Sequence, residues 1–253
     1  MEWYLEPWFW FLMLIVVMII AGVIQSKFKG TFNKTGAMPN SSGKSGGQIA
    51  REILQKNGID YVQVVAGSQR LGDNFNPMKK VITLSPEVYD SASIAAEAVA
   101  AHEVGHAIQW HNSYFAVKIR NFFLPIAQIG GSLSGVLLNV GFMVLFFGSI
   151  FVVDTTTNLM DDPTMIAGMW MLIIAAAGLG AVALFQLITL PVEFNASARA
   201  KKQLVDGDYI NSSEKNAVAS TLNAAAMTYV VAVVQTLAYI VYILSIVLAS
   251  RRG

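Results

Sequence analysis

The sequence predicts a mostly α-helical membrane protein, with about four transmembrane helices and a small α+β region around one H-E-x-x-H helix. Three observations predict this fold class: long apolar runs, basic residues confined to a few segments, and the motif itself. Hydrophobic residues make up 55% of the 253 residues and charged residues only 13%, against about 25% charged in an average soluble domain. The shortage of charge is concentrated in a few runs, which favours an integral membrane protein over a large soluble core.

Four apolar runs are long enough to cross a bilayer. The first, residues 8–24, has acidic residues before it and basic residues after it, unlike a cleavable secretory signal. The second covers residues 122–153 and is too long for one untilted span, so we expect a broken or interfacial lead-in around Pro125. The third and fourth runs cover residues 164–190 and 227–249.

The distribution of Lys and Arg predicts the orientation. Fifteen of the 17 lie in the segments between the first and second runs and between the third and fourth runs. Basic residues accumulate on the cytoplasmic side of a membrane, and four spans place both segments on that same side. Arg251 and Arg252 are the exception, because this topology places them outside.

These features divide the chain into five expected parts. They are a transmembrane helix (1–24), a membrane-attached region with the H-E-x-x-H helix (25–122), a transmembrane hairpin (123–190), a helix with a polar segment (191–226), and a last transmembrane helix with its tail (227–253). Within the second part we expect a Gly- and Ser-rich linker, a short helix at 48–56, strands at 61–65 and 81–84, and the motif helix from about residue 91.

The motif helix contains His102, Glu103 and His106. Residues four apart lie on one face of a helix, so both histidines can bind one ion while Glu103 reaches a water on it. The alternative is an ordinary helix whose histidines satisfy polar needs. Residues 95–101 are mainly Ala and Val, however, and burying three polar side chains beside them without a metal would cost several kcal/mol. Gly105 inside the helix costs about 1 kcal/mol relative to Ala, which indicates a close packing partner.

A catalytic zinc ion normally has three protein ligands and one open position. His111 and Glu97 each lie five residues from a motif histidine, which rotates them off the ligand face. Glu193 is an isolated acid at the end of the third apolar run, where a proline predicts the start of a new helix, and it lies on the same predicted side as the motif. Its alternative role is an acid that stabilises a helix N-terminus. We expect His102, His106 and Glu193 to bind Zn²⁺.

The chain resembles the neutral zinc metallopeptidases of bacterial membranes, the YugP type, and more distantly the HtpX-like and CAAX prenyl peptidases. The shared features are the first-span anchor, VAAHEVGHAIQ, the inserted transmembrane hairpin and LPVEFNAS, over nearly the whole chain. The resemblance implies a bacterial plasma membrane protein of gluzincin-like, zincin type. It also implies that His102, His106 and Glu193 bind zinc and that Glu103 is catalytic.

Three asparagines depart from the family pattern. Asn195 stands where an Asp is usual, and Asn74 and Asn76 stand where a His and an Asp are common. Carboxylates that orient zinc-binding histidines can change affinity or activity 10- to 100-fold. These replacements leave the expected zinc ligands intact but predict that activity or specificity differs from the family's.

The predicted function is a membrane-embedded zinc metalloendopeptidase that hydrolyses peptide bonds of a protein or peptide substrate, membrane proteins included. A zinc-bound water attacks, and Glu103 takes its proton and passes it to the leaving amine. Tyr114, Tyr209 and Arg199 are candidate oxyanion donors, and residues 81–84 are expected to be an edge strand that pairs with the substrate. The sequence has no stripe of basic residues interleaved with aromatic residues, so we expect no nucleic-acid partner.

Three alternatives remain. A site-2-type intramembrane protease would need an Asp from a later span, but the LVDG segment at 204–207 lies in a polar stretch. A non-catalytic or weakly active zinc-binding scaffold would not need Glu103 beside its ligands. A transporter is disfavoured because the apolar runs contain almost no charged residues.

Overall fold

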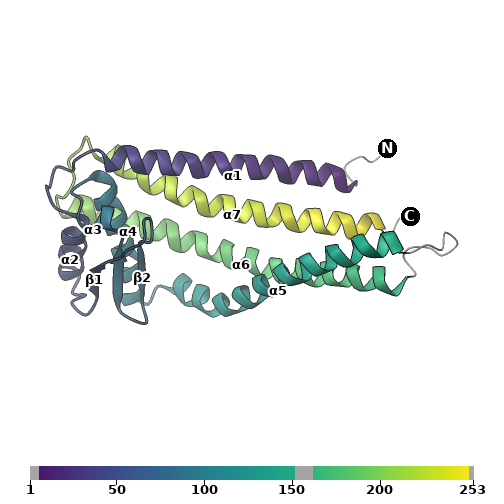
Figure 1. Cartoon of the computed structure of the whole chain (residues 1–253). Coiled ribbons are helices and arrows are strands. Elements are labelled where there is room, and N and C mark those ends of the chain that lie inside the picture. Colours follow the sequence, from purple (N-terminus) through teal and green to yellow (C-terminus); the bar gives the residue numbers. More distant parts are fainter. Residues whose placement is uncertain (1–5, 152–161, 251–253) are drawn as a thin grey trace. The chain divides into compact units, whose positions relative to one another are not determined.

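The chain is described by a computed structural model that covers residues 6–151 and 162–250. Most of residues 154–163, which connect the second and third apolar runs, and the Arg251–Arg252 pair lie outside these residues. The described part is mostly helical with one small sheet (Figure 1). Four helices are long and apolar enough to cross a membrane: α1 (Pro7–Gly36), α5 (Phe115–Phe151), α6 (Pro163–Asp206) and α7 (Lys215–Ser250). The predicted fold class and number of spans are confirmed.

The chain forms two compact units. The first, which we call the membrane unit, comprises residues 1–22, 120–188 and 231–253, and the second, the catalytic unit, comprises residues 23–119 and 189–230. Helices α1, α5, α6 and α7 therefore each contribute residues to both units.

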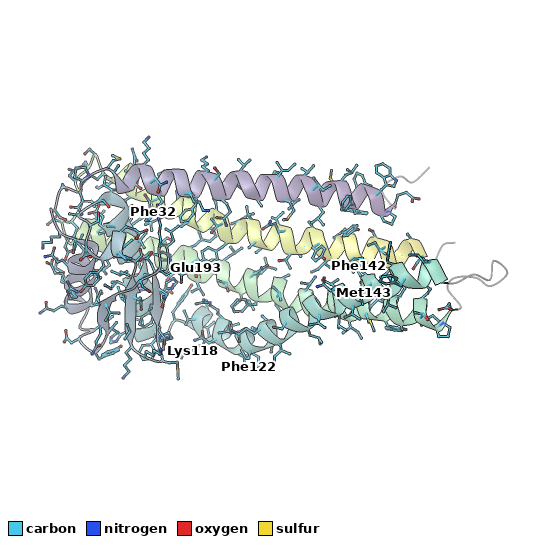
Figure 2. The ribbon with its side chains drawn as sticks, in the orientation of Figure 1. Phe32, Lys118, Phe122, Phe142, Met143 and Glu193 are labelled. Carbon is cyan, nitrogen blue, oxygen red and sulfur yellow. The ribbon has the colours of Figure 1, made fainter. Side chains whose placement is uncertain are left out.

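In the membrane unit, α5 and α6 pack through small residues. A Cβ on Gly130 would lie 2.9 Å from the carbonyl oxygen of Gly178, and the Ser134 hydroxyl donates a hydrogen bond of 2.8 Å to the carbonyl of Ala175. Large apolar side chains such as Phe122 and Met143 point outward and are 68% and 55% exposed (Figure 2). Close approach of small residues, with apolar side chains on the outside, is typical of helices packed in lipid.

Two expected helix boundaries are wrong. We expected a break near Pro125 and a new helix after Pro191, yet α5 and α6 each continue through their proline. A proline removes one backbone hydrogen bond, and packing against neighbouring helices allows apolar helices to accept that loss. Helix α1 also runs 12 residues past the expected end of its span, because Phe32 and Thr35 of its last turns are buried in the catalytic unit.

The catalytic unit contains α2 (Gly46–Lys56) and a three-stranded sheet. Ser45 caps α2 together with the Gln48 side chain in a capping box. The strands are β1 (Gln63–Ala66), β2 (Asn74–Asn76) and β3 (Val81–Leu84), in the order β1-β3-β2.

Strand β3 is therefore the central strand, and the expectation that residues 81–84 form an edge strand is wrong. It pairs in parallel with β1 and antiparallel with β2, where Phe75 lies opposite Ile82. The missed strand β2 has the sequence Asn-Phe-Asn, and asparagine is depleted in strands, so its sequence predicts a loop.

Helix α3 (Pro86–Tyr89) leads into α4 (Ile94–His111), which carries the motif. The Ser93 hydroxyl caps α4 by accepting a hydrogen bond from the Ala96 amide. Thirteen of the 18 residues of α4 are buried, and seven of these are alanine or glycine. These small side chains let α2 and the sheet pack closely around α4, which makes it the central helix of this unit.

Candidate active site

The structure brings the three predicted zinc ligands together. His102 and His106 lie on α4 and Glu193 projects from α6 (Figure 2). The two histidine Nε2 atoms are 3.2 Å apart, and Oε2 of Glu193 lies 3.3 Å from that of His102 and 3.5 Å from that of His106. In a tetrahedral zinc site with bonds of about 2.0–2.1 Å, neighbouring ligand atoms are about 3.3 Å apart. The triangle of donor atoms therefore has the dimensions of a zinc site.

The hydrogen bonds of the imidazoles also fit a cation. His106 Nδ1 lies 3.0 Å from Oε1 of Gln109, and the Gln109 amide group donates to the carbonyl of Val192 at 2.7 Å and to Oδ1 of Asn195 at 3.0 Å. Because the amide nitrogen of Gln109 donates to these two acceptors, its Oε1 atom is left to accept a hydrogen bond from Nδ1–H of His106. That tautomer leaves the lone pair on Nε2, as metal binding requires.

His102 has a similar contact on its other side. Its Nδ1 lies 3.2 Å from the hydroxyl of Ser197, which is buried one turn after Glu193 on α6. The hydroxyl can accept a hydrogen bond from Nδ1, and in that tautomer both Nε2 lone pairs converge on Glu193, whose Oε2 is buried. Three electron-rich atoms so close together favour a cation between them.

Close packing of α4 on α6 holds this arrangement. A Cβ on Gly105 would lie 2.6 Å from the carbonyl oxygen of Ala196. The backbone of Ala196 is therefore the close packing partner that a glycine at position 105 indicated. Ala196 lies between Glu193 and Ser197, so the glycine lets the two ligand-bearing segments approach each other.

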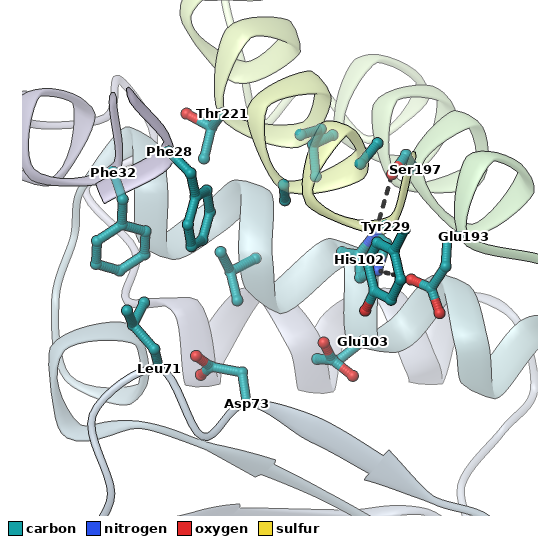
Figure 3. Close-up of a pocket in the computed structure, with 14 residues that line it drawn as sticks. Phe28, Phe32, Leu71, Asp73, His102, Glu103, Glu193, Ser197, Thr221 and Tyr229 are labelled. Atoms are coloured by element: carbon teal, nitrogen blue, oxygen red, sulfur yellow. Dashed lines mark hydrogen bonds and ion pairs between the residues drawn. The ribbon is translucent and has the colours of Figure 1, made fainter. Parts of the chain in front are cut away.

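Glu103 is 7% exposed and lines the same cavity as His102 and Glu193 (Figure 3). Burial raises the pKa of Glu103, and the histidine charges oppose this effect. A general base gains strength when its pKa approaches the working pH. Nearby Asp73 also has a pKa raised by burial, and its carboxylate accepts hydrogen bonds from the amide and hydroxyl of Ser85.

The two rejected ligand candidates lie elsewhere. His111 Nδ1 is 2.9 Å from the hydroxyl of Tyr61, and Glu97 is completely buried without a hydrogen bond to either carboxylate oxygen. Asp206 of the LVDG segment pairs with Lys202 at 2.6 Å on the surface of α6. None of the three belongs to the histidine–glutamate cluster.

The candidate oxyanion donors are engaged outside the cavity that contains Glu103. The Tyr209 hydroxyl donates to Glu52 at 2.9 Å, and the Arg199 side chain donates to Asn195 at 2.7 Å and lies over the ring of Tyr114. Tyr229, which the sequence analysis missed, does line the cavity beside His102 and Glu193 (Figure 3).

The three unusual asparagines have structural contacts. Oδ1 of Asn195 accepts hydrogen bonds from both Gln109 and Arg199, so it supports His106 indirectly as an Asp could. Asn74 donates to the carbonyl of Gly72, and Oδ1 of Asn76 accepts from the backbone of the turn that follows. Gln109 and Ser197 were not predicted, although Gln109 stands one helical turn after His106.

Comparison with known proteins gives two matches. The family described as "Putative neutral zinc metallopeptidase" matches residues 10–248. The chain is 38% identical over 227 residues to "Putative membrane protease YugP" of Bacillus subtilis (strain 168), which covers 90% of this chain and 91% of the relative. No solved structure matches the chain.

Proposed function

Because this chain belongs to the neutral zinc metallopeptidase family, we propose that it is a membrane-embedded zinc endopeptidase in which His102, His106 and Glu193 hold the ion and Glu103 is the general base. The observation that carries this proposal is the triangle of donor atoms, with sides of 3.2, 3.3 and 3.5 Å, beside a buried glutamate. The hydrogen bond of Gln109 supports it by leaving the Nε2 lone pair of His106 available, and the Ser197 hydroxyl can accept from Nδ1 of His102 in the same way.

When bound, zinc acts as a Lewis acid that polarises the scissile carbonyl and lowers the pKa of water. Glu103 then takes a proton from the attacking water as the new C–O bond forms. It returns that proton to the amine nitrogen as the C–N bond breaks, so that one carboxylic acid and one amine are released. Burial raises the pKa of Glu103, which makes it a stronger base for the first of these transfers.

The substrate backbone pairs, in this proposal, with the outer edge of β2 rather than with β3. Both sides of β3 are occupied, whereas the outer edge of β2 has no strand partner among residues 6–151 and 162–250. Phe75 of β2 packs edge-on against Trp110 of the motif helix, with ring centroids 6.4 Å apart. An exposed edge strand held against the motif helix is suited to bind an extended peptide.

The charge pattern supports a cytoplasmic catalytic unit, since its two segments contain fourteen of the 17 Lys and Arg and Arg120 directly follows the first of them. Adding a protease to sealed right-side-out and inverted vesicles tests on which side of the membrane the catalytic unit lies. We expect cleavage within the exposed loop around Met78, which is 91% exposed, only in inverted vesicles. Cleavage only in right-side-out vesicles would reverse the orientation.

Zinc content and peptidase activity of the purified protein test the chemistry. Glu103→Gln should retain zinc and lose at least about 1,000-fold in kcat, and Glu193→Ala should lose zinc. Asp206→Ala is the matched control, because it removes an exposed acid from the same helix. Full zinc occupancy in Glu193→Ala would refute the ligand assignment, and unchanged activity in Glu103→Gln would refute the mechanism. A wild type that binds zinc but cleaves no peptide would support the non-catalytic scaffold.

A further inference from the structure

The cavity beside Glu103 has two chemically different ends. Its polar end is formed by His102, Glu103, Glu193, Ser197 and Tyr229. Its other end, which we call the apolar end, contains Phe28, Phe32 and Leu71, together with Asp73 and Thr221. Figure 3 shows Phe28, Phe32 and Leu71 grouped away from His102 and Glu193, with Glu103 facing the space between them. A group that enters the apolar end therefore lies next to the reacting bond.

We propose that the apolar end of this cavity is a specificity pocket, which accepts one large apolar side chain of the substrate directly beside the scissile bond. This inference rests on the proposed peptidase function and adds to it the class of substrate. It assigns a function to the last turns of α1 and the first turns of α7, which supply Phe28, Phe32 and Thr221.

The size of the cavity limits what can enter. Its volume is about 160 Å³, close to that of an engineered cavity of about 150 Å³ that binds benzene. One phenylalanine or leucine side chain fits such a space, whereas a substrate helix does not. The substrate therefore enters as an extended segment, in agreement with pairing along β2.

Leu71 lines the cavity although its backbone conformation is unfavourable. Leu71 has a φ of 54°, in the left-handed region that costs a non-glycine residue about 1–3 kcal/mol. Its side chain is nevertheless a wall of the cavity. The loop is held there by Asp73, whose carboxylate accepts two hydrogen bonds from Ser85 at the end of β3.

Asp73 is the acidic residue closest to the apolar end in Figure 3, so recognition of a basic side chain is the competing hypothesis. Two observations disfavour it. The carboxylate already accepts hydrogen bonds from the amide and the hydroxyl of Ser85. The walls around it are aromatic and aliphatic.

The test uses quenched fluorescent peptides that differ in a single residue, Ala, Leu, Phe or Arg, placed in turn on each side of the cleaved bond. For the wild type we expect kcat/KM to be about 10- to 100-fold higher with Leu or Phe than with Ala, on one of the two sides. Ala225→Leu, which narrows the cavity, should remove most of this preference. Leu71→Ala, which widens it, should increase the preference for Phe over Leu.

Ala224→Leu is the matched control, because Ala224 neighbours Ala225 on α7 but does not line the cavity. Zinc content should be the same in all three variants. Hydrolysis with no preference among Ala, Leu and Phe, or a preference for Arg, would overturn the pocket assignment. The absence of hydrolysis of every peptide by the zinc-loaded wild type would instead overturn the proposed function.

Discussion

Replacement of Gly105 by alanine tests whether the contact between α4 and α6 sets the geometry of the proposed zinc ligands. The added methyl group would lie 2.6 Å from the carbonyl oxygen of Ala196, whereas ordinary contacts begin at 3.4 Å. One of the helices must therefore move by about 0.8 Å near Glu193. Metal–ligand distances tolerate only about 0.2 Å, so we expect the affinity for zinc to fall by about 10- to 100-fold.

The free energy of unfolding should also fall, because the larger of two opposing effects is destabilising. Alanine is favoured over glycine in a helix by about 1 kcal/mol, while overpacking a tight contact costs about 1–3 kcal/mol. We expect a net loss of up to about 2 kcal/mol. Competition with a chromophoric chelator measures the affinity, and thermal unfolding with and without zinc measures the stability.

Gly30→Ala is the control for this experiment. Gly30 lies in α1, and a Cβ there would meet no atom within 4 Å. The control should keep its affinity for zinc and be as stable as the wild type or slightly more so. Wild-type affinity in Gly105→Ala would refute the argument that this contact positions the ligands.

Two further predictions concern buried polar side chains of α4. Burial and the charge of Glu214 raise the pKa of Glu97 from 4.5 to about 8. The folded state therefore retains a proton that the unfolded state releases, so the contribution of Glu97 to stability is most favourable below about pH 4.5 and becomes less favourable by up to about 5 kcal/mol as the pH rises through 8. In thermal unfolding, Glu97→Gln should reduce the difference in stability between pH 5 and pH 8. The same difference in the variant as in the wild type would contradict this assignment. Gln109→Leu should weaken zinc binding about 10- to 100-fold, because His106 loses the acceptor that fixes its tautomer, whereas Gln55→Leu on the exposed face of α2 should not change it.

Features set by local periodicity could be predicted from the sequence. The spacing of His102 and His106 places both on one helix face whatever surrounds the helix, and the apolar runs are long enough to span a bilayer in any arrangement. The β-branched run Val81–Leu84 likewise forms a strand with the expected bounds. Each of these depends on neighbours within a few residues, and each is found in the structure.

Features that depend on distant neighbours were decided only by the tertiary structure. Proline alone predicts a helix boundary, but packing keeps α6 continuous through Pro191 and places Glu193 in the interior of a helix. Strand β2 exists because β3 offers it a partner, and the Gln109 amide is aligned because α6 presents the carbonyl of Val192. Sequence by itself determined which residues could bind zinc, since side-chain chemistry and helical period are local. Only the packing of α4 on α6 decided that Glu193, 87 residues after His106, lies beside both histidines.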